Sequence, residues 1–292
     1  VELPVDRYGR VDPADVEAAL TDRTILVAIG HANNEVGTVQ PVAEVVRRVR
    51  ANAPKGCLVA VDAIASAAYL KVDVGELGAD LVAIAGHKLE GPKGVGALYV
   101  KAGTHILGQQ HGGTQERHRR AGTEDVAGAV GMGVAVQLAV AERDATARRL
   151  RRARDRLASA LTGMTGVELT GHPRDRLPGL VSIVVRDVEG ASLVVKLDLE
   201  GVAASVGSAC TTGSAEPSHV LTAMGYPEDE ARGALRFSLG RTTTDADVDD
   251  ALERVPRIVA AARTAAVMLA AQRLALGPAT AAASDAGSVV VG

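Results

Sequence analysis

Aromatic residues are nearly absent from this sequence. The 292 residues include one Phe, four Tyr and no Trp. Proteins that bind single-stranded nucleic acid or quaternary ammonium ligands use aromatic rings as stacking surfaces, so the composition argues against both functions. Basic residues are not in excess either, because 32 Lys and Arg face 35 Asp and Glu, a net charge of −3. We therefore expect no nucleic-acid partner and a core built from Val, Ala and Leu.

Cysteine and long uncharged runs are also scarce. Two cysteines cannot form a disulfide framework. The first residues, VELPVDRYGR, lack the basic region and apolar run of a signal peptide. The longest charge-free stretch, Val126–Ala141, holds three glycines and is too short to span a bilayer. These absences predict a soluble cytoplasmic protein without a membrane partner.

The first part of the chain alternates short apolar runs with helical patterns. Hydrophobic residues make up 47 % of the sequence, enough to bury a sizeable core, and the length suggests two domains. Asp12 followed by Pro13 is typical of a helix start, and residues 41–53 form an amphipathic pattern. The predicted strands are Thr24–Ile29, Leu58–Val61, Leu81–Ile84 and Val95–Val100. Strands separated by helices predict an α/β fold with a parallel or mixed sheet.

The pattern changes near Gly122. A long helix is predicted from Glu124 to about Leu161, followed by shorter units. The units are strands at Leu180–Val185, around Val202–Ser205 and at Ala234–Leu239, and helices near residues 191–199, 217–224 and 245–271. We expect a large α/β domain over residues 1–122, a smaller α+β domain over 123–270, and a disordered tail over 271–292.

Polar residues follow the apolar runs at the point where each predicted strand ends. Asn34 follows the first run, Asp62 the second, and His87 with Lys88 the third. Ligands of open α/β sheets bind at the carboxyl ends of the strands, so these side chains are expected on one rim. A partly desolvated lysine can form a Schiff base, and an aspartate can pair with a protonated pyridine nitrogen. Taken singly, these residues could equally be a surface lysine and a helix-capping aspartate.

The two cysteines differ in setting. Cys210 lies among Gly, Ser and Thr residues typical of a mobile loop, where a thiol is more useful as a reactive group than as a structural one. Cys57 precedes an apolar run and is predicted to be a core residue. His105, His111 and His118 are six and seven residues apart, so they do not share one helical face. We expect no metal site.

Six stretches of the chain carry a resemblance to a known family. In order they are HANNEVGTVQP, VDAIASAAYLKVDV, DLVAIAGHKLEGPKGVGALYV, HGGTQERHRRAGTEDVAGAVGMG, SVGSACTTGSAEPSHVLTAMG and RFSLGRTTTDADVD. Together they resemble the cysteine desulfurases of the class V aminotransferase family, which are pyridoxal-phosphate enzymes. The resemblance runs from about residue 5 to about residue 262. The resemblance implies the fold type I of pyridoxal-phosphate transferases, here a partial large α/β domain followed by a smaller α+β domain.

The resemblance also implies a cofactor site. Lys88 would hold pyridoxal phosphate covalently, and Asp62 would pair with its ring nitrogen. His87 would reach the phosphate, and Asn34 would position the ring and the bound amino acid. Thr123 would touch the phosphate of the partner subunit's cofactor, which implies a homodimer.

The implied reaction removes sulfur from L-cysteine and leaves L-alanine. Arg236 would bind the substrate carboxylate, a task that suits the guanidinium fork. Cys210 would take the sulfur as a persulfide and pass it to an acceptor protein such as an iron–sulfur scaffold. Lys88 and His87 are candidates for moving the substrate's α-proton. Another pyridoxal-phosphate reaction on the same scaffold, such as that of a selenocysteine lyase or a β-lyase, is an alternative.

Several positions depart from the family pattern. Ala65 stands where desulfurases usually have a Gln, Ala85 where many have a Ser, and Glu90 where an aromatic residue is common. Each lost hydrogen bond to a charged group could cost roughly 1.5–3 kcal/mol of cofactor binding. The family's leading third has no counterpart before Val1, so an N-terminally incomplete chain is expected, and an inactive remnant of the fold is a further alternative.

Overall fold

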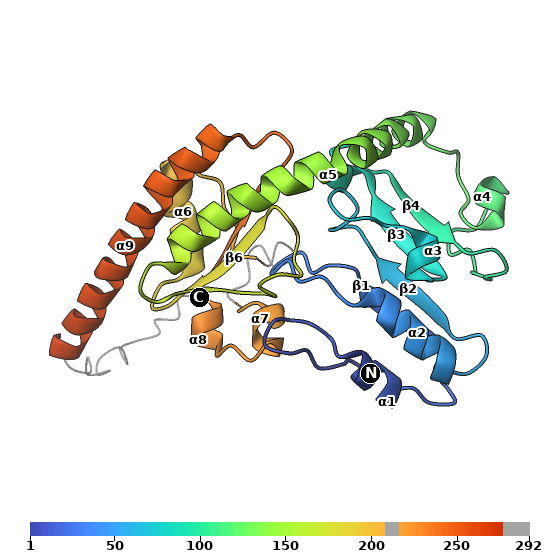
Figure 1. Cartoon of the computed structure of the whole chain (residues 1–292), viewed down its shortest axis with the longest axis horizontal. Helices are drawn as coiled ribbons and strands as arrows, with labels where there is room; N and C mark the ends of the chain where they lie inside the picture. The colour runs from blue at the N-terminus through green and yellow to red at the C-terminus, as the bar shows by residue number, and fades with distance from the viewer. Residues whose placement is uncertain (208–215, 277–292) are drawn as a thin grey trace, which may run out of the picture.

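Two β-sheets joined by one long helix organise residues 1–207 and 216–276, the part of the chain that the computed structural model describes (Figure 1). The first sheet has the order β1-β2-β3-β4. Its strands are β1 (Leu26–Gly30), β2 (Leu58–Asp62), β3 (Leu81–Ala85) and β4 (Gly96–Val100). The first three are parallel, and β4 runs antiparallel to β3. All four predicted strands are confirmed, with ends shifted by at most two residues.

One face of this sheet is covered by the amphipathic helix α2 (Val42–Asn52). Its buried valines, among them Val45 and Val49, pack against Val59 of β2 and Val82 of β3. Two shorter helices, α1 (Pro13–Ala18) and α3 (Val74–Leu77), lie on the same side (Figure 1). The predicted start of α1 is confirmed, because the Asp12 side chain accepts a hydrogen bond from the Ala14 amide at 2.8 Å.

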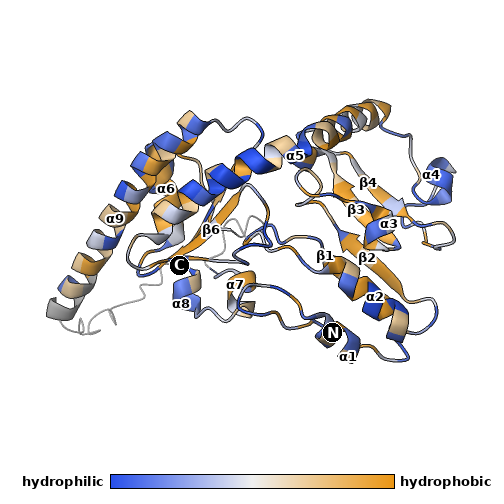
Figure 2. Cartoon of the chain, in the orientation of Figure 1, coloured by the Kyte–Doolittle hydropathy of each residue, from blue (hydrophilic) through white to orange (hydrophobic). Residues whose placement is uncertain are grey.

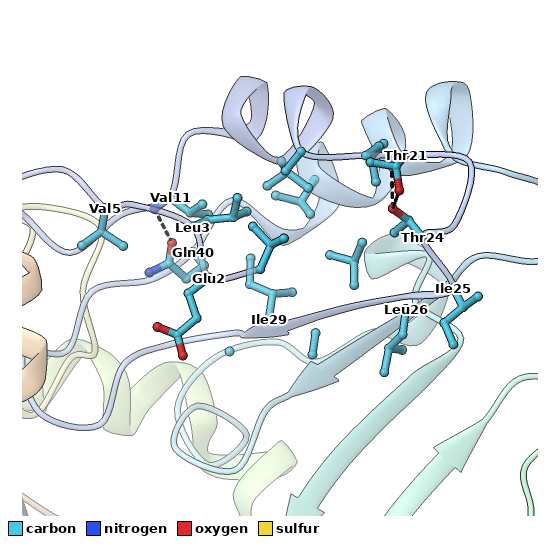
Figure 3. Close-up of a pocket in the computed structure, with 18 of the residues that line it drawn as sticks. Glu2, Leu3, Val5, Val11, Thr21, Thr24, Ile25, Leu26, Ile29 and Gln40 are labelled. Carbon is cyan, nitrogen blue, oxygen red and sulfur yellow. Dashed lines mark hydrogen bonds between the residues drawn. The ribbon is translucent and has the colours of Figure 1, made fainter.

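Within the described residues, no helix covers the opposite face of the sheet, and no strand pairs with the outer edge of β1. A hollow of about 360 Å³, lined in part by Ala28, Ala60 and Ala83, lies on this face, and Leu98 of β4 is 52 % exposed there. Within the described residues, β1 has a strand neighbour on one side only. A groove of about 750 Å³ follows its free edge, with Leu3, Val5 and Val11 on one side (Figure 3). An uncovered apolar edge is a surface on which further polypeptide can pair.

The second sheet is antiparallel, with the order β5-β6-β7. Its strands are β5 (Val167–Leu169), β6 (Leu180–Val185) and β7 (Ala234–Ser238). Every residue of β6 is buried, because the helices α6 (Gly190–Leu199) and α9 (Asp245–Leu276) and part of the long helix pack around it. The short helices α7 (His219–Ala223) and α8 (Glu228–Ala231) follow the gap in the described chain.

The predicted strands of this second part differ from the observed ones at two places. The strand expected around Val202–Ser205 is wrong, since only one isolated bridge joins Ser205 to Arg236. The short strand β5 was not predicted; its three residues are too few to give a periodic signal. The remaining strands and helices of this part are confirmed, with boundaries displaced by a few residues.

The long helix α5 (Val126–Thr162) packs against both sheets. Near its start, Met132 and Ala135 pack against Leu89 beside the first sheet. Near its end, Leu157 and Leu161 enter the core of the second sheet. The predicted division of the chain at residues 122 and 123 therefore stays a prediction, because one rigid element crosses from one sheet to the other.

The apolar half of α5 is mostly exposed. Val126, Val130 and Val134 are each at least 50 % exposed, and Figure 2 shows hydrophobic colours along this half and hydrophilic ones along the other. The charge-free stretch was expected to be too short to cross a membrane. The helix that contains it is long and apolar enough by length and composition, and 17 % of the relevant window is buried.

The predicted tail begins too early. Helix α9 continues to Leu276, so residues 271–276 are helical and not disordered. The reason is local, because the run AAQRLAL consists of strong helix formers and the first helix-ending signal is Gly277 followed by Pro278. The rest of the predicted tail, residues 277–292, lies outside the described residues.

The loop after β1 connects the first sheet to the second. Val39 N donates to Asp175 O at 2.9 Å, and Leu177 N donates to Gly37 O at 2.8 Å. The buried Arg176 side chain donates from Nη2 to the carbonyls of Val36 and Thr170 at 3.3 and 3.1 Å. Burial, with a smaller contribution from Arg154, lowers the pKa of Arg176 to about 10. These bonds fix the loop whose residues continue into the candidate site.

A glycine in the turn after β3 tests how tightly this rim is built. A Cβ at Gly86 would lie 2.9 Å from both Pro92 O and Val95 Cγ1, so we expect Gly86→Ala to destabilise the chain by about 1–3 kcal/mol in urea unfolding. Gly133→Ala in α5 is the control, since a Cβ there meets nothing within 4 Å. It should be neutral or stabilise by up to about 1 kcal/mol. Equal stability of the two variants would contradict the tight turn.

Candidate functional site

The structure brings the predicted polar residues to one rim of the first sheet. Asp62 is the last residue of β2, and Asn34 lies in the loop after β1. His87 and Lys88 lie in η1 (Gly86–Leu89), the 3₁₀ turn that follows β3. The backbone register places Gly30 beside Asp62 and Asp62 beside Ala83. The expectation of a shared rim is therefore confirmed, while the chemical role of each residue stays a prediction.

Asp62 presents a carboxylate with room beside it. Its Oδ1 accepts a hydrogen bond from Ile64 N at 2.8 Å, and its backbone oxygen accepts one from His31 N at 2.7 Å. Among the described residues, Oδ2 has no partner. The neighbours in register, Gly30 and Ala83, have small side chains, which leaves space for a flat ring next to the carboxylate. The geometry suits a group that pairs with a ring nitrogen.

Lys88 is exposed, as is His87. The expected partial desolvation of the lysine is therefore not provided by the described part of the chain. The turn around it is nevertheless well defined: Gly86 N donates to Val95 O and Gly91 N to Gly86 O, each at 2.9 Å. Glu90, at φ 60°, ends the turn in the left-handed region.

Glu90 has a structural partner that the sequence did not indicate. Its Oε2 accepts from Arg241 Nε at 2.9 Å. Arg241 lies in the turn before α9, so this ion pair joins the 3₁₀ turn to the second part of the chain. A carboxylate at this position is thus explained by an ion pair between the two parts of the chain.

Arg236 reaches the rim from the second sheet. It lies in β7, and its Nη1 donates to Asn34 O and to Gly207 O, both at 2.9 Å. Its Nε is buried without a hydrogen-bond partner. Burial lowers the pKa of Arg236, and Glu35 acts in the opposite direction. A guanidinium beside the rim suits a carboxylate ligand.

Cys210 lies outside the described residues, so the structure does not place its thiol. Gly207, held by Arg236, is the last described residue before it. Cys57 is confirmed as a core residue at 5 % exposure, and burial raises the pKa of its thiol.

Thr123 is not hydrogen-bonded to the rim residues in the described part of the chain. It is exposed in the segment before α5, and within the described residues it has no hydrogen bond to the other candidates. The three spaced histidines are also exposed, and His118 ends the short helix α4 (Gln115–His118). In residues 1–207 and 216–276, no three His, Cys, Asp or Glu side chains come together to hold a metal ion.

Two buried polar pairs near the rim were missed from the sequence. The Ser66 hydroxyl donates to Ala63 O at 3.1 Å, so its oxygen accepts from His31 Nδ1 at 2.9 Å. This assigns the proton of the neutral imidazole to Nδ1. Ser218 Oγ donates to Glu35 Oε2 at 2.6 Å, with both side chains buried. No local sequence signal marks these pairs, because the members are 35 and 183 residues apart.

Comparison with known proteins agrees with this arrangement. The model of the family described as Aminotransferase class-V matches residues 1–251. This chain belongs to the class V aminotransferase family. Enzymes of this family depend on pyridoxal phosphate.

The relatives of this class V chain include desulfurases. It is 47 % identical over 257 residues to the cysteine desulfurase IscS of Methanosarcina thermophila, covering 88 % of this chain and 63 % of the relative. It is 45 % identical to the enzyme of the same name from Dictyoglomus turgidum, with coverages of 90 % and 66 %. The chain thus spans less than two thirds of the length of these curated relatives.

Solved structures of NifS-like proteins share the fold. One has a TM-score of 0.82 at 35 % identity and covers 89 % of this chain and 68 % of its own. Another, from Rickettsia africae, has a TM-score of 0.79 at 27 % identity, with coverages of 88 % and 68 %. The expected fold type I of pyridoxal-phosphate transferases is confirmed for this class V chain.

The buried His31 makes stability depend on pH. Burial lowers its pKa below the ordinary 6.5, so the unfolded chain takes up a proton at pH values where the folded ring stays neutral. The stability that the neutral His31 ring provides is fully present above about pH 6.5. It is lost as the pH falls through the pKa of the folded state. We expect His31→Gln, which can still donate to Ser66, to lose less stability between about pH 7 and about pH 5 in urea unfolding.

The control for this measurement is His105→Gln, which changes an exposed ring. This variant should show the same dependence of stability on pH as the unchanged chain. The assignment to His31 is refuted if His31→Gln loses as much stability at low pH as this control.

Proposed function

We propose that the protein is a pyridoxal-phosphate-dependent cysteine desulfurase that takes sulfur from L-cysteine, releases L-alanine and holds the sulfur as a persulfide on Cys210. The observation that carries the proposal is the meeting of three groups from separate elements. The Lys88 amine follows β3, the Asp62 carboxylate ends β2, and the Arg236 guanidinium reaches the same rim from β7. The names of the similar proteins support the same activity.

The chain's own residues fit pyridoxal phosphate. Lys88 would hold it covalently, the free Oδ2 of Asp62 would keep its ring nitrogen protonated, and Asn34 would orient the ring. When bound, this cofactor accepts the electrons released as bonds to the substrate's α-carbon break. His87 would bind the phosphate. The Lys88 amine and the His87 ring, neighbours in one turn, are the bases available to move the α-proton.

Arg236 would orient the substrate by its carboxylate, and Cys210 would complete the reaction. The thiolate of Cys210 attacks the substrate sulfur, so an S–S bond forms while the Cβ–S bond breaks. The electron pair of the broken bond stays on the carbon skeleton, which takes up a proton and leaves as L-alanine. No external oxidant is needed, because the carbon is reduced as the transferred sulfur is oxidised.

The outer sulfur of the persulfide must then leave the enzyme. An acceptor protein such as an iron–sulfur scaffold would take the sulfur from Cys210. Because a reactive thiol has to stay reduced between cycles, we further propose a cytoplasmic location.

The proposed function is tested by covalent trapping on the purified chain. After incubation with pyridoxal phosphate and borohydride reduction, we expect mass spectrometry to find the cofactor on Lys88 and nowhere else. Lys88→Ala should abolish this label. With L-cysteine added, alkylation should reveal a persulfide on Cys210, and Cys210→Ala should lose it but keep the label on Lys88.

Two outcomes separate the alternatives. Alanine formation that persists in Cys210→Ala would favour another pyridoxal-phosphate lyase. Absence of label from Lys88 would favour an inactive form of the fold, as would be expected if Ala65 and Ala85 weaken cofactor retention.

We also propose that the working protein is a homodimer in which Thr123 reaches the partner's cofactor phosphate. In support, Thr123 is exposed, and within the described residues it makes no hydrogen bond to the rim of its own chain. The adjoining half of α5 carries the exposed stripe Val126, Val130 and Val134, with one residue on each successive turn. Exposed apolar stripes of this kind are typical of interfaces.

A charge in the stripe should separate the subunits. We expect Val130→Asp to shift the chain from dimer to monomer in analytical ultracentrifugation, by about tenfold or more in dissociation constant, because an unpaired carboxylate would be buried. Val195→Asp, on an exposed valine of α6, is the control and should leave the dimer intact. A dimer unaffected by Val130→Asp would place the interface elsewhere.

A further inference from the structure

Glu35 is a buried carboxylate near Arg236, which is called the clamp here because it is proposed to bind the carboxylate of the substrate. It is 6 % exposed and follows Asn34, whose carbonyl accepts a hydrogen bond from Arg236. Its Oε2 accepts from Ser218 at 2.6 Å. The proposed reaction uses neither Glu35 nor Ser218.

Gly207 links the Glu35 carboxylate to the Arg236 guanidinium. The Gly207 carbonyl accepts from Arg236 Nη1 at 2.9 Å. On the other side of the same residue, a Cβ built on Gly207 would lie 3.5 Å from Glu35 Oε2. The two charged groups therefore flank one glycine, and attraction to Glu35 raises the pKa of Arg236 against the effect of burial.

Neither group is neutralised by a direct ion pair. Across residues 1–207 and 216–276, no carboxylate lies within 4.0 Å of an Arg236 nitrogen, and no basic group lies within that distance of Glu35. Glu35 therefore attracts the Arg236 charge without forming an ion pair with it. Its Nε remains without a hydrogen-bond partner.

We propose that Glu35 is an affinity-determining residue: its negative charge balances Arg236 in the empty site and, by repelling a second carboxylate, limits how tightly that arginine holds a carboxylate ligand. This inference rests on the proposed function, since it takes Arg236 as the clamp. Substrate and product both carry a carboxylate, so the same repulsion that weakens substrate binding also speeds product release.

The sign of the effect distinguishes this role from a structural one. Glu35→Gln removes the charge, and the Gln oxygen can still accept from Ser218. With the repulsion gone, the affinity for a carboxylate should rise by about three- to tenfold, as expected for charges several ångströms apart near a protein surface. A residue that only supports the fold would lower the affinity when replaced.

The experiment follows the Arg236 Nε–H signal in ¹⁵N NMR of the full chain without cofactor, assigned by its disappearance in Arg236→Lys. Titration with propionate should shift this signal, with a dissociation constant about three- to tenfold lower in Glu35→Gln than in the unchanged chain. Ethylamine, which lacks a carboxylate, should leave the signal unchanged in both.

Two control variants isolate the charge of Glu35. Glu76→Gln removes a carboxylate from an exposed ion pair with Lys71 and should not change the dissociation constant. Ser218→Ala removes the hydrogen bond but keeps the Glu35 charge and should not tighten binding. Should Glu35→Gln fail to fold, Glu35→Asp draws the charge back by one methylene and should tighten binding by a smaller factor.

Three outcomes would overturn the inference: propionate leaves the Arg236 signal unchanged, binding in Glu35→Gln is equal or weaker, or Glu76→Gln tightens binding equally. None of them bears on the trapping of pyridoxal phosphate by Lys88, because neither the cofactor nor that lysine takes part. Conversely, failure of the trapping experiment leaves this measurement unaffected.

Discussion

The two hydrogen bonds from Arg236 Nη1 are the interaction on which the candidate site depends. One goes to the Asn34 carbonyl in the loop after β1, and the other to the Gly207 carbonyl in the second part of the chain. Arg236 itself belongs to β7. A single guanidinium group therefore fixes three segments that are distant in sequence, and the rim of the first sheet becomes a site only where the second sheet meets it.

Backbone geometry, more than side-chain packing, places the polar groups of the rim. The register that aligns Gly30, Asp62 and Ala83 is set by main-chain hydrogen bonds between parallel strands. Lys88 depends in the same way on a turn closed by backbone bonds through Gly86. The side chains themselves stay exposed, which leaves them available for a ligand but provides none of the desolvation that would tune their reactivity.

Local signals explain how much of this could be predicted. The apolar runs gave four strands of the first sheet, and Asp12 with Pro13 gave the start of α1, because both patterns act within a few residues. The shared rim followed from the strand ends. The pairs His31–Ser66 and Glu35–Ser218 could not be found this way, since their members meet only after folding. The exposure of Lys88 likewise depends on surroundings that no short motif encodes.

The single helix α5 constrains how this protein can diverge. Its 37 residues pack against the first sheet at one end and against the second at the other. Inserting or deleting one residue midway would rotate the two ends relative to each other by about 100°, so both packing faces could not be kept. Surface loops can change length freely, whereas the number of residues between Met132 and Leu157 has to stay constant.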